Sequence, residues 1–395
     1  MSESFRWHPE ARLFDSTGTE ILRESARSPE GTTFPDTPQG LAAAIGRPAF
    51  RIGANELPPP DPHEQPILET LTSGSTGQPR RIRRTQASWT ASFAVNADLG
   101  IGPGARMATL GRLIHSLSLY GAIEGLHLGA EVHLLADLRP DRQRTALSDR
   151  KITHLYATPA QLRLLLGPGA LPDLRLILVG GSKLDPALRT ALATLAPNAQ
   201  IREFYGAAET SFITLADETT PQDSVGRPYP GVDLHLDSGG EVWVQSPYLF
   251  LGYAFHLCPN IPAGGSPTTR WRDGWLSVGE IGEMQDGFLI LKGRAGRMVT
   301  VADQNVFPEE IEAFLHSLPG ITRAAVLPVP DAKRGHALIA ILQGDPAQEA
   351  AILTTLRQQL GPLKSPKALI WREDWPVLPS GKTDLKALEA TLWLA

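Results

Sequence analysis

Residues 72–80, Thr-Ser-Gly-Ser-Thr-Gly-Gln-Pro-Arg, combine hydroxyl groups, glycines and an arginine in one short segment. Gly74 and Gly77 let backbone N–H groups approach a ligand closely, because glycine has no Cβ. The hydroxyls add hydrogen-bond donors, and Arg80 adds a fixed positive charge. The segment predicts a phosphate-holding loop, although its spacing is not that of a Walker loop. The alternative is an ordinary solvated loop.

Two later segments carry groups that could act with this loop. Residues 203–210, Glu-Phe-Tyr-Gly-Ala-Ala-Glu-Thr, predict a Tyr-Gly turn that offers an aromatic face. In the same segment Glu209 offers a carboxylate, the oxygen ligand type that Mg²⁺ takes. Residues 273–294 predict a hairpin with an acid, Glu280, and a base, Arg294, at its ends.

Two segments near the C-terminus carry fewer groups that could take part in chemistry. Residues 305–312 place Pro308 and several acids where a helix begins, which is helix-initiation chemistry. Residues 379–384, Pro-Ser-Gly-Lys-Thr-Asp, present Lys382 in a glycine-containing turn. Taken singly, each of these segments also fits an ordinary structural role.

The elements that must position these groups follow an α/β pattern. From residue 67 onward, apolar strand-type runs alternate with helical segments, which favours a largely parallel sheet covered by helices. We expect strands at 105–110, 131–135 and 174–179, and helices at 159–166 and 184–195. After about residue 225 short alternating strands separated by Gly and Asp turns take over, and residues 254–274 predict an irregular loop.

The chain therefore divides into two predicted domains. Residues 1–296 form a large domain of layered sheets and helices, within which 53–66 is a proline-rich connector. Residues 297–395 form a small α+β domain. We expect its helices at 308–318 and near 346–360, and its strands at 323–329 and 337–343.

Composition excludes several classes of protein. The formal net charge of −5 argues against nucleic-acid binding, despite the run Arg80, Arg81, Arg83, Arg84, whose outer members are expected to form a solvated face. The one cysteine, Cys258, fits a reducing cytoplasm. The charged N-terminus predicts no signal peptide, and no apolar run is long enough to span a membrane.

Taken in order, these segments resemble the adenylate-forming superfamily of acyl- and aryl-CoA synthetases, luciferase-like enzymes and peptide-synthetase adenylation domains. The resemblance covers about residues 67–388. The loop matches TSG[ST]TGxPK with Arg80 in place of lysine, and YGAAE at 205–209 matches YGxTE. GEVWVQSPYLFLGY, DGWLSVGEIGEM and PSGK match three further family segments.

The resemblance implies an ATP-dependent ligase with a mobile C-terminal domain, and it implies a role for each matching residue. The β- and γ-phosphates of ATP would be held by Thr72, Ser73, Gly74, Ser75, Thr76, Gly77 and Arg80. The nucleotide and acyl group would lie against Gly181, Ser182, Tyr205, Gly206, Glu280 and Arg294. Catalysis would use Lys382, Glu209 as the Mg²⁺ ligand, and His115 near the acyl group, where a core histidine is the alternative.

Three departures from the family pattern stand out. Only 66 residues precede Ile67, so the N-terminal subdomain is expected to be reduced. Arg297 replaces the usual Asp or Lys at the hinge and cannot lose its charge. Residues 300–304 lack the usual glycine-rich turn, which makes approach of a pantetheine arm harder.

The family resemblance leaves the thiol acceptor and the acid open. The leading hypothesis is activation of a carboxylic acid to acyl-AMP and transfer to CoA. Its alternatives are loading of a phosphopantetheinyl carrier protein, or release of the acyl-AMP. A catalytically retired nucleotide- or acyl-binding protein is the alternative from a different class. No nucleic-acid partner and no membrane span are expected.

Overall fold

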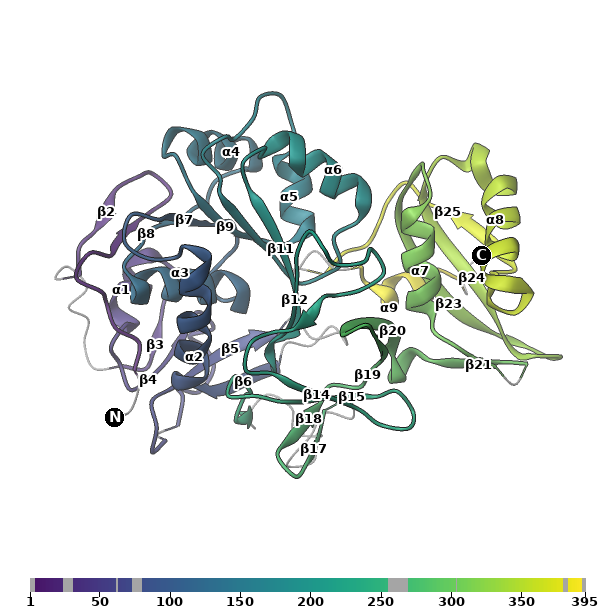
Figure 1. Ribbon diagram of the computed structural model, residues 1–395, viewed down its shortest axis with the longest axis horizontal. Helices are drawn as coiled ribbons and strands as arrows, with labels where there is room; N and C mark the ends of the chain where they lie inside the picture. The colour runs from purple at the N-terminus through teal and green to yellow at the C-terminus, as the bar shows by residue number, and fades with distance from the viewer. Residues whose placement is uncertain are drawn as a thin grey trace.

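The computed structural model describes residues 4–23, 31–61, 63–72, 80–254, 269–302, 304–378 and 383–392. The larger part of the chain is built on three sheets and a two-stranded ribbon, with helices around the two larger sheets, and a smaller unit lies beside it (Figure 1). This is the α/β architecture, large and small parts included, that the sequence predicts. Within the described residues, no helix has the length and apolar character needed to cross a membrane.

The larger sheet has nine strands, and the six from β11 to β1 run parallel. Its strands in spatial order are β13 (Arg227–Pro228), β12 (Ser211–Ala216), β11 (Gln200–Ala207), β10 (Leu176–Val179), β9 (His154–Ala157), β7 (Arg106–Thr109), β8 (Glu131–Leu134), β1 (Arg12–Phe14) and β2 (Glu20–Ile21). Its helices are α3 (Ser116–Leu128), α4 (Pro140–Asp149), α5 (Pro159–Leu165) and α6 (Pro186–Leu195).

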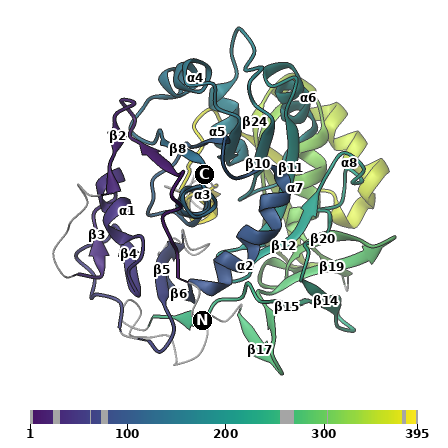
Figure 2. The same cartoon turned by 60° about the vertical axis from the view of Figure 1, so that its left-hand side comes forward.

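Both faces of this sheet are buried, and this explains its continuous apolar strands. In β10, Leu176 and Leu178 join the core that contains α3, whereas Ile177 and Val179 join the core beneath α4, α5 and α6. Figure 2 shows α3 apart from α4. The parallel strands must end at one edge, where the functional loops are expected.

The helices begin where the local sequence supplies capping residues. Thr158 forms a capping box with Gln161 ahead of α5, and Asp185 caps α6 through the backbone N–H of Leu188. A proline opens each of these helices, at the position where its missing N–H costs nothing.

The second sheet carries the strands on either side of the predicted phosphate loop. Its order is β16 (Gly252–Tyr253), β6 (Arg80–Thr85), β5 (Ile67–Thr72), β4 (Ala49–Ile52) and β3 (Thr33–Phe34), with α1 (Pro38–Ala44) and α2 (Ala87–Asn96) nearby. A third sheet contains β14 (Asp233–Leu236), β15 (Val242–Gln245), β18 (Trp275–Ser277) and β17 (Arg270–Arg272). The ribbon of β19 (Glu280–Gln285) and β20 (Phe288–Arg294) follows.

The smaller unit has its own core, formed where helices cover a three-stranded sheet. It contains β21 (Val299–Val301), β22 (Gln304–Val306), α7 (Pro308–Ser317), β23 (Ile321–Asp331), β24 (Gly335–Gly344), α8 (Glu349–Lys364), β25 (Ala368–Trp371) and α9 (Leu385–Leu392). A kink at Gly361 (φ 78°) interrupts α8 just before Pro362.

Two local predictions are wrong. Tyr205 and Gly206 lie inside β11, which continues to Ala207 through a bulge between them, so they do not form a turn. Cross-strand pairing with β12 overrides the turn tendency of the Tyr-Gly pair. Within the predicted irregular loop, Arg270–Arg272 form β17 because they pair with β18.

Candidate active site

The ends of the phosphate-type loop are held next to each other by sheet pairing. Thr72 at the end of β5 lies opposite Arg80 at the start of β6 in the antiparallel register. The loop residues Ser73, Gly74, Ser75, Thr76 and Gly77 lie outside the described residues. Arg80 is half-buried, and its guanidinium carbon is 5.7 Å from the centre of the Tyr253 ring.

Glu209, the predicted Mg²⁺ ligand, lies in the tight connection between β11 and β12. Gly206 makes this connection possible, because a Cβ there would be 1.8 Å from the carbonyl oxygen of Ser211. The hydroxyl of Tyr253 donates to Oε1 of Glu209 at 2.7 Å, and the Glu209 carbonyl accepts from the N–H of Phe250 at 2.8 Å. The carboxylate is therefore fixed beside the strand that carries Arg80.

Arg84 is a residue of this site that the sequence reasoning missed. It is 1% exposed, so the expectation of a solvated face is wrong for it. Its Nη atoms donate to the Ala208 carbonyl and the Ser211 hydroxyl, both at 2.7 Å, which fastens the connection that carries Glu209. Burial lowers the pKa of Arg84 to about 10, and the charge of Glu209 opposes that change.

The opposite face of β6 carries a buried charge cluster. The Glu69 carboxylate, fully buried, is 3.0 Å from Arg81, 3.1 Å from Arg51 and 2.9 Å from Arg83. Arg51 and Arg81 also donate to the Pro58 carbonyl, at 2.9 and 2.8 Å, which fastens the proline-rich connector. The strand period of two explains why the arginine run divides between two faces.

The predicted hairpin brings Glu280 and Arg294 directly opposite each other. Nε of Arg294 donates to Oε1 of Glu280 at 2.9 Å, and Glu280 is 8% exposed. Beside this pair, the Tyr205 hydroxyl is buried without a hydrogen-bond partner among the described residues. Burial raises the pKa of Tyr205, and the nearby charge of Glu280 raises it further. The structure therefore brings these three side chains together; their predicted roles toward the nucleotide stay predictions.

His115 and the Gly181-Ser182 pair lie at the same edge of the sheets. His115 is the N-cap residue of α3, forms a β-bridge with Leu71, the residue before the predicted loop at 72–80, and is half-buried. Burial lowers its pKa, with Asp36 opposing and Arg112 reinforcing the change. Gly181 (φ 96°) and Ser182 follow β10 and are exposed.

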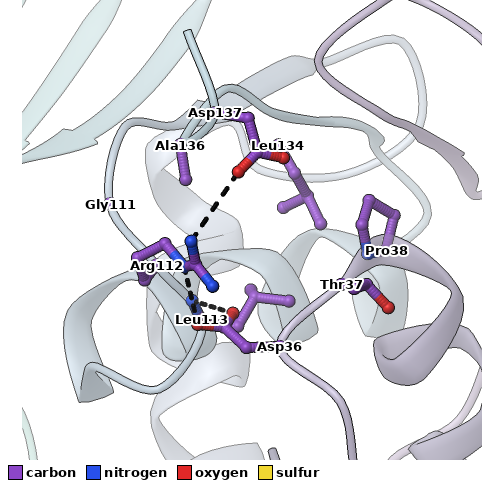
Figure 3. Close-up of a pocket in the computed structure, with 9 residues that line it drawn as sticks. All are labelled: Asp36, Thr37, Pro38, Gly111, Arg112, Leu113, Leu134, Ala136 and Asp137. Atoms are coloured by element: carbon purple, nitrogen blue, oxygen red, sulfur yellow. Dashed lines mark hydrogen bonds and ion pairs between the residues drawn. The ribbon is translucent and has the colours of Figure 1, made fainter. Parts of the chain in front are cut away.

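A shallow hollow near His115 is lined by Asp36 and Arg112, whose Oδ2 and Nε atoms are 2.8 Å apart (Figure 3). Asp137 lies on the far side of Arg112 at 3.8 Å. None of the residues predicted to bind the nucleotide lines this hollow.

The connection to the small unit is held by ionic contacts. Arg297 lies in a short 3₁₀ turn and contacts Glu312 of α7 at 2.7 Å and Glu309 at 3.3 Å. Its guanidinium also donates to the Val326 carbonyl at 3.0 Å. Arg297 is therefore anchored to the small unit. Lys382 lies outside the described residues.

The predicted turn at residues 300–304, which lacks glycine, contains a residue in a backbone conformation that favours glycine. Ala302 has a φ of 47°, in the left-handed region, and connects β21 to β22. A non-glycine residue in this region is strained.

Family models match most of the chain. The model described as AMP-binding enzyme matches residues 13–254, and the model described as AMP-binding enzyme C-terminal domain matches residues 310–382. Among curated proteins, an acyl-CoA ligase of Bacillus subtilis described as uncharacterized, YhfT, is 32% identical over 83% of this chain and 69% of its own. The fatty acid–[acyl-carrier-protein] ligase ScoC of Streptomyces coeruleorubidus is 26% identical over 97% of this chain and 79% of its own.

Solved structures share the fold of this chain. The amide bond synthetase McbA of Marinactinospora thermotolerans superposes with a TM-score of 0.77 at 22% identity, covering 98% of this chain and 97% of its own. The o-succinylbenzoate CoA synthetase MenE of Bacillus subtilis, with its acyl-adenylate intermediate, gives 0.70 at 22% identity over 82% of this chain and 68% of its own.

Proposed function

Because this chain belongs to the AMP-binding enzyme family, and is thus an adenylate-forming ligase, we propose that it activates a carboxylic acid with ATP and transfers the acyl group to CoA. The observation that carries this proposal is the 2.7 Å hydrogen bond from Tyr253 to Glu209, with Arg80 beside the same ring. Through Tyr253, Arg80 at the start of the strand that follows the phosphate-type loop lies close to the Glu209 carboxylate of the YGAAE segment.

In the first step, an oxygen of the substrate carboxylate attacks the α-phosphorus of ATP. The bond from that phosphorus to the pyrophosphate oxygen breaks, which yields acyl-AMP and pyrophosphate. Both reactants are anions, so repulsion and orientation form much of the barrier. Arg80 on the phosphates and Lys382 beside the carboxylate and α-phosphate would offset this negative charge.

Glu209 would hold Mg²⁺, and the donor set fits that ion. Mg²⁺ prefers oxygen ligands and is commonly shared between one or two carboxylates and the phosphates of a nucleotide. In the described part of the chain, no group of three or more His, Cys, Asp or Glu side chains forms a complete protein metal site. When bound, Mg²⁺ neutralises phosphate charge and orients the leaving group.

The remaining side chains would place the nucleotide and the acid. Tyr205 would contact the adenine, and the Glu280–Arg294 pair would hold the ribose, since Glu280 Oε2 can accept from a hydroxyl while Oε1 is held by Arg294. Gly181, Ser182 and Gly206 would form the wall between nucleotide and acyl group. His115 would lie near the acyl group.

In the second step, a thiol sulfur attacks the acyl carbon and the acyl–phosphate bond breaks, which releases AMP. CoA is the proposed acceptor because curated relatives include proteins named as acyl-CoA ligases. A carrier protein is the second candidate, since the relative matched over 97% of this chain is named as an acyl-carrier-protein ligase. A cytoplasmic location is proposed from the single cysteine and the use of ATP.

The first half-reaction can be tested by ATP–pyrophosphate exchange over a panel of aromatic, fatty and amino acids. Lys382→Ala should lower exchange by about 10²–10³-fold while leaving the fold intact, because one electrostatic donor is lost. The exposed Lys333→Ala is the matched control and should keep wild-type exchange. Exchange with no acid, or unchanged exchange in Lys382→Ala, would contradict the proposal. Thioester formation with CoA and with a phosphopantetheinyl carrier protein then identifies the acceptor.

A further inference from the structure

Tyr253 joins three segments that are far apart in the sequence. It lies in β16, which pairs antiparallel with β6 so that Tyr253 is opposite Ile82. Backbone bonds of 2.9 Å connect the N–H groups of Leu251 and Ala254 to the carbonyls of Arg83 and Arg81. The same segment reaches the β11–β12 connection through the 2.8 Å bond from the Phe250 N–H to Glu209. Its backbone is therefore fixed on two sides.

The hydroxyl of Tyr253 is held at the centre of a short hydrogen-bond chain. It donates to Oε1 of Glu209 at 2.7 Å and lies 2.9 Å from the hydroxyl of Thr269. A tyrosine hydroxyl has one proton, so Thr269 must donate while Tyr253 donates to the carboxylate. Thr269 is 7% exposed, which shields this chain from water. A hydrogen bond to a charged acceptor in such surroundings is stronger than a neutral one.

The ring of Tyr253 also lies against the cation of the phosphate-type loop, with the Arg80 guanidinium carbon 5.7 Å from its centre. That distance suits a cation–π contact. Burial raises the pKa of Tyr253, Glu209 raises it further, and side-chain hydrogen bonds to Thr269 and Arg80 oppose the change. A tyrosine hydroxyl is ordinarily protonated at neutral pH, so it can donate to Glu209.

We propose that Tyr253 is a positioning residue of the adenylation step. Its hydroxyl holds one oxygen of Glu209, so that the other stays available to Mg²⁺, and its ring orients Arg80 toward the phosphates. This inference rests on the proposed function. Loss of such an outer partner of a metal ligand costs about 10–100-fold in metal affinity or activity.

The test is a Mg²⁺ titration of Tyr253→Phe, which keeps the ring and removes the hydroxyl. In ATP–pyrophosphate exchange, the half-saturating Mg²⁺ concentration should rise at least about 10-fold, with rate recovered at high Mg²⁺. A second readout needs no turnover: the Mg²⁺ concentration that raises the unfolding temperature of the ATP-bound protein should increase by the same factor.

Tyr248→Phe is the matched control. Tyr248 is buried at 3% exposure, and its hydroxyl donates to the Pro230 carbonyl at 2.6 Å, so this substitution removes a comparable buried hydroxyl that bonds to Pro230 instead of Glu209. This control should titrate with Mg²⁺ like the wild type. Thr269→Val, which removes the donor to Tyr253, should shift the titration in the same direction by a smaller factor.

The outcomes separate the inference from the function on which it rests. Equal Mg²⁺ titrations for Tyr253→Phe and the wild type, in both readouts, would overturn the positioning role. So would an equal shift in Tyr248→Phe, because that would indicate a general loss of packing. A wild-type protein that shows no exchange but binds ATP with Mg²⁺ would refute the proposed function, and the thermal titration would still decide the role of Tyr253.

Discussion

The buried carboxylate of Glu124 is predicted to contribute less to stability as the pH rises. Glu124 lies on α3 with no exposed surface. Its oxygens accept from Tyr156 at 2.5 Å, Asn96 at 2.8 Å and Tyr120 at 3.1 Å. All three donors are uncharged. Burial therefore raises the pKa of Glu124 from 4.5 to about 7, against the opposing effect of these hydrogen bonds.

The sign and size of the effect follow from this pKa. The folded pKa is above the unfolded one, so the contribution of Glu124 is complete below about pH 4.5 and is lost as the pH rises to about 7. One pKa unit corresponds to about 1.4 kcal/mol, so the contribution of Glu124 to the free energy of unfolding should fall by about 3 kcal/mol over this interval.

The assay is urea unfolding, followed by tryptophan fluorescence, of the wild type and Glu124→Gln between about pH 4.5 and about pH 8. Other titrating groups cancel in the difference between the two proteins, which should change by about 3 kcal/mol. Glu218→Gln, at an exposed position, controls for the change of side chain. A wild-type minus Glu124→Gln difference that stays constant with pH would refute the reasoning.

Three further predictions concern single positions. Arg84→Met should lower the free energy of unfolding by about 2 kcal/mol in urea unfolding, because the Ala208 carbonyl and the Ser211 hydroxyl lose a charged donor; an unchanged midpoint would contradict this. Gly180→Ala should destabilise by about 1–3 kcal/mol, since its Cβ would be 2.2 Å from the ring of Phe204. Adding Phe204→Leu should recover part of that loss, and strictly additive effects would argue against the clash. Ala302→Gly should stabilise the small unit by up to about 1 kcal/mol, measured calorimetrically, because φ at this position is 47°; a lower unfolding temperature would refute the strain.

The local sequence determined the class of fold and the order of the candidate segments. Alternating apolar strands and capped helices are short-range signals, so α5 and α6 begin where Thr158 and Asp185 cap them. The hairpin that sets Glu280 opposite Arg294 was likewise predictable, because strand period and turn residues define its register. The family resemblance then indicated adenylation chemistry.

The tertiary structure alone decided which side chains meet. Nothing local to residue 253 indicates a bond to Glu209, because β16 reaches that carboxylate only by pairing with β6. Nor could the arginine run show that Arg84 is buried beneath the Glu209 connection while Arg81 is buried on the opposite face against Glu69. Burial and partners of charged groups depend on contacts distant in sequence, and these form only when the sheets come together. The segments that form the site can be predicted from the sequence, but the contacts that hold their charged side chains in place depend on the tertiary structure.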